Sequence, residues 1–226
     1  MRTSVLDRPV WNALSTRQIA FSTGGDRARR FAPDVGPLAA SRDNDPESLR
    51  ALVELVPATG TLLLLQADEV VLAPGTVAVT SAPGVQMIAD RAISALADDR
   101  IERLTDADAP AMLALATLTR PGPFAPRTPH LGEFWGVKQR GVLVAMAGER
   151  MKHEGFTEVS GVCTHPDARG GGLARLLSAW VASRIAARGE TPYLHAYASN
   201  TIAIELYRSL GFTVRCAMNV AAIARA

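Results

Sequence analysis

The chain has 226 residues, of which 48% are hydrophobic and 20% charged, a composition typical of a globular protein. Its 24 basic and 22 acidic residues leave a formal net charge of +2. This near-neutral balance argues against nucleic acid or an anionic membrane as the main partner. The two cysteines, Cys163 and Cys216, give no disulfide framework and no metal-ligand spacing. Without an apolar signal-like run near its start, the sequence predicts a cytoplasmic protein that binds no metal.

The first hundred residues predict a strand-rich region. Residues 45–56 form the one clear helix, in which Asp45 can act as the cap and the apolar residues share a face. The apolar runs 61–66 and 69–90 have the length of strands. We expect the second run to be broken at Pro74-Gly75 and at Pro83-Gly84.

From residue 101 onward strands and helices alternate. A short strand precedes a helix that begins at Thr105 or Asp106, and the proline-rich segment 120–136 is too irregular for either element. The remaining elements are identified by apolar periodicity and by flanking glycines. They are strands at 134–139, 142–151, 157–165, 193–199 and 212–223, and helices at 171–188 and 200–211.

Three glycines, Gly170 to Gly172, stand between a strand and a helix. A helix start offers unpaired amides and a partial positive charge, and glycine lets a phosphate approach the backbone. The alternative is a tight connection without a ligand. A P-loop is excluded because Leu173 follows the last glycine in place of lysine, and a dinucleotide fingerprint because Arg175 stands where a third glycine belongs.

Two stretches in this region resemble the GCN5-related N-acetyltransferases (GNAT family). "VCTHPDARGGGLARLL" (162–177) is similar to the family's acyl-CoA pyrophosphate loop, with Arg169, Gly172 and Ala174 at the signature positions. "ASNTIAIELYRSLGF" (198–212) is similar to the family's second conserved block, and the two occur in the expected order.

This resemblance implies an α/β fold with a mixed, mostly antiparallel central sheet flanked by helices. It covers about residues 101–223, which suggests an acetyltransferase domain at 99–226. Residues 1–98 look like the incomplete, strand-rich GNAT-like lobe of the two-lobed, FR47-like branch.

The resemblance also implies a binding site for acetyl-CoA as co-substrate. Backbone amides of the glycine loop would hold the pyrophosphate, and the end of the preceding strand and the start of the later helix would contact the pantetheine arm. The residues carried over in this way are Val162, Cys163, Thr164, Arg169, Gly170, Gly171, Gly172, Leu173, Ala174, Asn200, Ala203 and Tyr207. Asn200 has a sufficient structural role as a helix N-cap, and Cys163 as a small buried hydrophobe.

Acyl transfer to an amine also needs a general acid and a base. By resemblance, Tyr207 is the acid for the leaving thiolate, although a tyrosine here can also be a core residue. His195 and Glu158 are rival candidates for the base, and water is a third. Even spacing along a strand predicts that Glu158 faces the same side as Val162 and Thr164.

The expected function is transfer of an acetyl group from acetyl-CoA to a primary amine of a small molecule, an amino acid or a peptide. The amine would attack directly in a ternary complex, in a monomer or homodimer with no nucleic-acid or membrane partner. A catalytically weak CoA-binding sensor or scaffold is the alternative.

We expect segment 120–136 to form part of the acceptor wall, because loops often carry specificity. Phe124, Phe134 and Trp135 either line a pocket or fix the loop to the core. Arg127 and Arg140 are candidates for binding a carboxylate.

Overall fold

In the computed structural model, which describes residues 3–94 and 98–226, eleven strands form one sheet. The strands are β1 (Ser22–Gly24), β2 (Ala28–Phe31), β3 (Leu38–Ser41), β4 (Leu62–Gln66), β5 (Thr76–Ala89), β6 (Ile101–Arg103), β7 (Phe134–Gln139), β8 (Val142–His153), β9 (Phe156–Thr164), β10 (Thr191–Tyr197) and β11 (Phe212–Arg225). The α-helices are α1 (Pro9–Ser15), α2 (Pro46–Leu55), α3 (Ala109–Thr119), α4 (Leu173–Ala187) and α5 (Thr201–Ser209).

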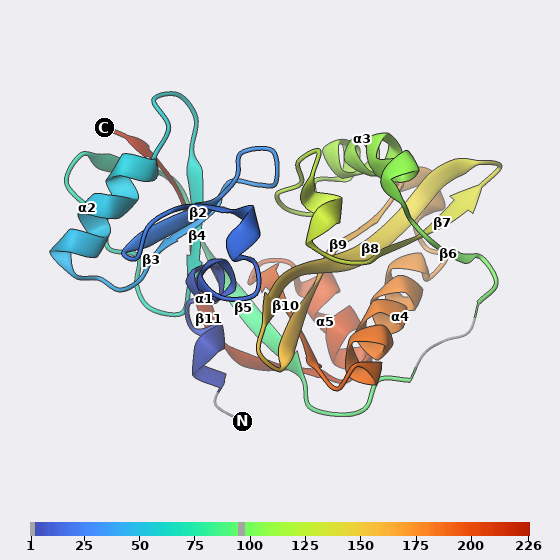
Figure 1. Cartoon of the computed structure of the whole chain (residues 1–226). Helices are drawn as coiled ribbons and strands as arrows, with labels where there is room; N and C mark the ends of the chain where they lie inside the picture. Colours follow the sequence, from blue (N-terminus) through green and yellow to red (C-terminus); the bar gives the residue numbers. More distant parts are fainter. Residues whose placement is uncertain (1–2, 95–97) are drawn as a thin grey trace.

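The sheet order is β1-β2-β3-β4-β11-β5-β10-β9-β8-β7-β6, and all neighbours are antiparallel except β3–β4 and β9–β10. Helix α3 covers one face of β7–β9, and α4 and α5 lie on the other side (Figure 1). The expected fold, a mixed and mostly antiparallel sheet flanked by helices, is confirmed. None of the helices in the described parts of the chain combines the length and apolar character needed to cross a bilayer.

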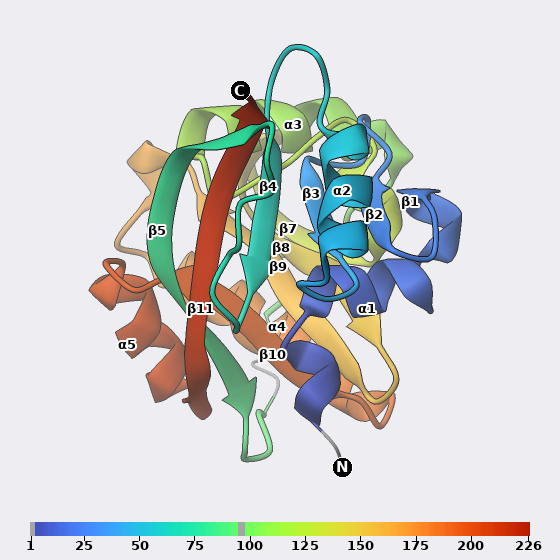
Figure 2. The ribbon, with the colours of Figure 1, turned by 90° about the vertical axis from the view of Figure 1, so that its left-hand side faces the viewer.

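Strand β5 lies in the middle of the sheet and joins its two halves. It pairs with β11 over its whole length, and from Gly84 to Ile88 it also pairs with β10 (Figure 2). The expected break at Pro83-Gly84 is therefore wrong. The Pro83 carbonyl accepts from the Ala198 amide, just beyond the end of β10. The Pro83 nitrogen faces this same side, where no strand continues. The missing N–H of proline therefore costs no hydrogen bond between strands.

The first 98 residues supply β1–β5, so the sheet is continuous across the boundary expected at residues 98 and 99. The division into lobes stays a prediction. Helix α2 lies within one residue of the expected span at each end, but Asp45 makes no side-chain capping bond and only its carbonyl accepts from Leu49. Helix α1 was not expected from the sequence. It has seven residues, and tertiary packing of Val10 and Leu14, both fully buried, holds it in place.

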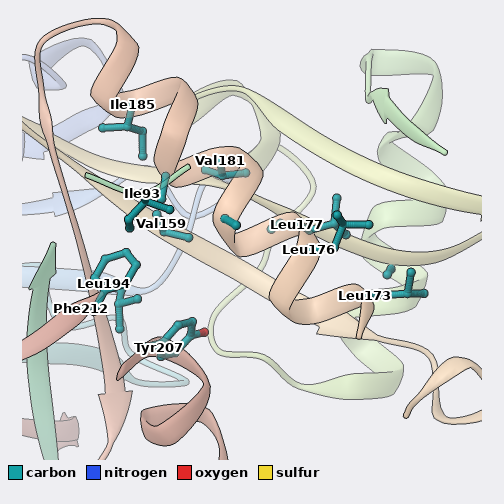
Figure 3. Close-up of a cluster of buried hydrophobic side chains, with 14 of the residues drawn as sticks. Ile93, Val159, Leu173, Leu176, Leu177, Val181, Ile185, Leu194, Tyr207 and Phe212 are labelled. Carbon is teal, nitrogen blue, oxygen red and sulfur yellow. The ribbon is translucent and has the colours of Figure 1, made fainter. Parts of the chain in front are cut away.

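Helix α4 covers the main core that supports the site. Leu173, Leu177, Val181 and Ile185 recur every four residues, so they lie along one face and are buried against the sheet (Figure 3). Burying each such side chain contributes about 1.5–3 kcal/mol, which fixes the helix start relative to the strands. A second core, beneath α1 on the opposite face, includes Tyr193 of β10.

Candidate active site

The site begins where two parallel strands separate. β10 pairs with β9 only from Thr191 to Tyr193, opposite Phe156 to Glu158. Beyond this point β9 continues to Thr164 and β10 to Tyr197 without pairing to each other. The open ends border a cleft of about 520 Å³. Because β8 pairs with the other edge of β9, the edge that faces the cleft has free backbone donors and acceptors.

The glycine loop forms one end of the cleft. Gly172 is the N-cap of α4 with φ +73°, and Gly170 has φ +83°, so both need the left-handed region that glycine adopts easily. A Cβ on either residue would meet no other atom within 4 Å. The first-turn amides of α4 have no intrahelical acceptor, and Gly172 has no side chain to cap them. The loop therefore presents open backbone donors, with roughly half a positive charge, to the cleft.

Most of the candidate binding residues lie around this end of the cleft. Lining the cleft are Val162, Cys163, Thr164, Arg169, Gly170, Gly172, Leu173, Ala174, Asn200, Ala203 and Tyr207. Gly171 is in the same loop but outside this lining. Cys163 is buried against Met146 and Phe134, and burial raises the pKa of its thiol to about 11. Its side chain is therefore a small hydrophobe rather than a nucleophile.

The start of α5 borders the same end of the cleft. Asn200 is the N-cap of this helix, and its Oδ1 accepts from the Ala203 amide at 3.2 Å. The ring of Tyr207 packs edge-on against Phe212, with 6.0 Å between ring centroids. Its hydroxyl points away from Phe212 and Leu194 (Figure 3). Burial raises the pKa of Tyr207 to about 12, so the hydroxyl keeps its proton at neutral pH.

A bulge in β9 changes the expected direction of Glu158. Gly161 has φ +63°, and an added Cβ would come within 3.0 Å of the Phe134 ring. Val159 and Val162 both pack on the core beneath α4. They are three positions apart, so regular alternation would place them on opposite faces of the sheet. The expectation that Glu158 shares a face with Val162 and Thr164 is therefore wrong, because the bulge reverses the alternation between them.

Glu158 lies at the apex of the cleft, where β9 and β10 separate, and its side chain is 1% exposed. Both of its oxygens accept from the guanidinium of Arg150, at 2.8 Å from Nε and 2.7 Å from Nη2. Oε1 also lies 2.7 Å from Nδ1 of His195. Burial alone would raise the pKa of Glu158, but the charge and hydrogen bonds of Arg150, with the hydrogen bond of His195, hold it well below its usual range.

His195 is held at both ring nitrogens. Since the Glu158 carboxylate accepts from Nδ1–H, Nε2 carries the lone pair, and it lies 2.9 Å from the amide nitrogen of Gln86. That amide also donates to the carbonyl of Leu6 at 2.9 Å. The structure thus brings both expected bases together at the apex. It also gives each of them a structural partner and leaves Glu158 outside the cleft lining.

Segment 120–136 contributes less to the cleft than expected. Its first residues, Arg120 to Pro123, line the opening. Phe124 and Phe134 pack edge-on at 5.7 Å, and Trp135 packs on Trp180 at 5.4 Å, so the aromatic residues fix the segment to the core.

The arginines expected to bind a carboxylate lie elsewhere. Arg127 pairs with Asp34 at 3.1 Å, and Arg140 is exposed between β7 and β8. The arginine that lines the apex is Arg150, which is not among the residues expected from the sequence. The signal was present, because Glu149 and Arg150 interrupt the apolar run of β8, and charges within a buried strand need partners.

Within the described residues, no group of three or more His, Cys, Asp and Glu side chains is arranged to hold a metal ion. The arrangement instead combines a backbone donor cluster, a free strand edge and a protonated phenol along one cleft. These are features suited to holding a phosphate-containing acyl donor and protonating its leaving group.

Comparison with known proteins agrees with this geometry. The FR47-like protein family model matches residues 135–220. A solved structure from Novosphingobium aromaticivorans, assigned to the GNAT family of acetyltransferases, is 43% identical over 98% of each chain, with a TM-score of 0.92.

More distant solved structures share the fold alone. A GCN5-related N-acetyltransferase from Kribbella flavida is 17% identical, with a TM-score of 0.65 over 97% of this chain and 94% of that one. A GCN5-related N-acetyltransferase-like protein from Streptococcus suis is 16% identical, with a TM-score of 0.60 over 96% of this chain and 92% of that one. No curated protein sequence matches significantly. On the strength of its full-length similarity to the Novosphingobium protein, the chain belongs to the GNAT family of acetyltransferases.

Proposed function

We propose that the protein transfers an acetyl group from acetyl-CoA to the primary amine of a small acceptor, by direct attack within a ternary complex. The observation that carries this proposal is the cleft between the separated ends of β9 and β10, which leads into the uncapped N-terminus of α4. The space beside Gly170 and Gly172, where an added Cβ would meet no atom within 4 Å, leaves room for a phosphate to approach these amides.

In this proposal the donor lies along the cleft from the glycine loop to the apex. Backbone amides from Arg169 to Ala174 hold the pyrophosphate, with the cationic side chains of Arg169 and Arg175 nearby in the lining. The free edge of β9 at Val162 and Thr164 holds the pantetheine arm and polarises the thioester carbonyl. Asn200 and Ala203 border the arm from α5.

The amine nitrogen attacks the thioester carbonyl carbon, a C–N bond forms, and the C–S bond breaks. Tyr207 donates its proton to the leaving thiolate and regains one from solvent. The hydroxyl is available for this role because its pKa of about 12 keeps it protonated at the pH of the reaction.

We propose that the amine loses its proton to water in the open cleft. The Glu158 carboxylate is enclosed and paired with Arg150, and both nitrogens of His195 have partners. These residues are better suited to positioning the apex than to taking a proton directly from the acceptor. The catalytically weak CoA-binding module remains the alternative, and turnover distinguishes the two.

The role of the first 98 residues is part of the same proposal. Leu38, Leu63 and Leu65, from β3 and β4, line one side of the cleft. We propose that this lobe closes the acceptor side of the cleft.

Calorimetric titration with acetyl-CoA and with CoA tests the donor site. Gly172→Glu places a carboxylate where the pyrophosphate would lie, and we expect it to abolish micromolar binding. Gly189→Glu is the matched control, because Gly189 follows the other end of α4 with a similar φ of +78° and a Cβ there meets nothing within 4 Å. Loss of binding in both variants, or no binding by the wild type, would contradict the proposal.

A further inference from the structure

The apex of the cleft has one cation among apolar walls. Leu38, Leu63 and Leu65 lie on one side, and Met218 and Val220 of β11 extend the same wall. Arg150 is the arginine at the apex, whereas Arg120 lies at the opening, Arg169 in the glycine loop and Arg175 in the first turn of α4. Among the described residues that line the cleft, none is acidic.

This composition argues against a polycationic acceptor. A polyamine or a lysine-rich segment has further ammonium groups, and each would need a carboxylate or several acceptors when removed from water. The carboxylate nearest to the apex, Glu158, is enclosed and already paired. The lining therefore favours an acceptor that has one amine, apolar bulk and, if charged elsewhere, a negative group.

One end of the Arg150 guanidinium is not used by Glu158 and can bind a negative group of the acceptor. Glu158 uses Nε–H and one Nη2–H, in a fork of two bonds. Nη1 makes no hydrogen bond to a described residue, and it is not among the enclosed nitrogens that lack a partner. Since Arg150 lines the cleft with 11% of its side chain exposed, the free Nη1–Nη2 end is accessible from the cleft.

The groups around Arg150 hold this end in place. Glu158 fixes the orientation of the guanidinium, His195 fixes Glu158, and Gln86 fixes His195. The backbone carbonyl of Arg150 accepts from Gln18 at 2.6 Å, so the strand position is fixed as well. A guanidinium oriented in this way can bind a second carboxylate with two parallel bonds at little further cost in side-chain entropy.

We propose that Arg150 binds the carboxylate of the acceptor, and that the acceptor is an α-amino acid with an apolar side chain. This inference rests on the proposed function, because it names the substrate class of the same cleft. The amine adjacent to the bound carboxylate then faces the donor, and the side chain packs against Leu63, Leu65 and Val220.

Product binding tests the carboxylate site without requiring turnover. The CoA-saturated protein is titrated with N-acetyl-L-leucine and with N-acetyl-L-leucinamide, which differ only in the carboxylate. We expect the acid to bind at least about tenfold more tightly than the amide, since a bidentate charge-assisted contact is lost in the amide.

Removing Arg150 alone would leave the Glu158 carboxylate buried without its cation, so the variant that tests the contact is Arg150→Met with Glu158→Gln. Its matched reference is Glu158→Gln alone, which retains Arg150. We expect the preference for the acid to persist in the reference and to disappear in the double variant. Arg140→Met, at an exposed turn away from the cleft, should keep the full preference.

Equal binding of acid and amide by the wild type, or an unchanged preference in the double variant, overturns the carboxylate site. The outcome for the proposed function is read separately. Acetylation of leucinamide or a simple alkylamine, without binding of N-acetyl-L-leucine, rejects the carboxylate site and leaves acetyl transfer standing. Tight binding of N-acetyl-L-leucine without acetylation of leucine supports the carboxylate site and rejects acetyl transfer.

Discussion

The two ends of the cleft are built from different parts of the chain. At the donor end, the residues from Val162 to Ala174 follow one another, and their contribution is backbone geometry. At the apex, Arg150, Glu158, His195 and Gln86 come from β8, β9, β10 and β5, and their contribution is a network of side-chain contacts.

The ends also differ in how they carry charge. The donor end is open, and its positive character comes from amides that have no partner until an anion binds. The apex is enclosed, and its one cation is balanced by a buried carboxylate. We therefore expect changes at the apex to affect folding strongly, and changes at the donor end to affect binding and turnover more than folding.

The largest effect should come from Arg150→Met. It leaves the Glu158 carboxylate buried without its cation, and breaking such a pair costs roughly 3–5 kcal/mol. The free energy of unfolding, measured by urea denaturation at pH 7.5, reports this cost. The double variant Arg150→Met/Glu158→Gln should recover most of it. A loss below about 1 kcal/mol in the single variant would mean that the apex pair is not enclosed, and the contrast with the donor end would disappear.

Tyr207→Phe should change turnover and leave binding and folding nearly unaltered. We expect kcat to fall about 100-fold, the lower end of the range for losing a general acid. Because the pKa of Tyr207 is about 12, wild-type activity should show no titration of this group below about pH 10. Calorimetry with CoA provides the control. A kcat within about threefold of the wild type would remove Tyr207 from the proposed chemistry.

His153, beneath the apex, should make stability depend on pH. Burial lowers the pKa of His153 to about 4, although the charge of Glu158 opposes the shift. Its unfolded value is near 6.5, so the unfolded chain binds the proton first as the pH falls, and stability is lost between about pH 6.5 and 4.

His153→Gln removes this titration and keeps a possible partner for the Tyr193 hydroxyl, which lies 2.8 Å from the histidine Nε2. The wild type should lose about 2 kcal/mol relative to the variant between pH 7.5 and pH 5. Parallel pH profiles of the two unfolding free energies would mean that folding does not shift the pKa of His153.

The contrast between the two ends also explains which parts of the site could be predicted. The glycine loop and Asn200 are recognisable because their roles depend on local backbone conformation, which a short stretch of sequence encodes. Arg150 and Glu158 meet only after β8 and β9 pair, and the Gly161 bulge then alters which face each side chain takes. Strict alternation along a strand cannot anticipate such a bulge.

The fold shows the same limit. The expected helix at 171–188 begins two residues late, at Leu173, because Gly172 adopts positive φ. The expected break of β5 at Pro83 is absent because pairing with β11 continues past it, and this depends on a strand more than 120 residues later. Helix α1 is stabilised by tertiary contacts that its seven residues do not reveal.

The smallest effect should come from Asn200, where a structural and a binding role coincide. Asn200→Ala removes the cap on α5 and should cost about 1 kcal/mol of stability, whereas Asn200→Ser keeps an oxygen for the Ala203 amide and should cost little. Both variants lose the side-chain amide that we propose contacts the pantetheine arm. Both should therefore bind CoA about fivefold more weakly by calorimetry, since one neutral hydrogen bond contributes about 1 kcal/mol. If affinity falls only in Asn200→Ala, in step with stability, the residue acts on the donor through the helix cap alone.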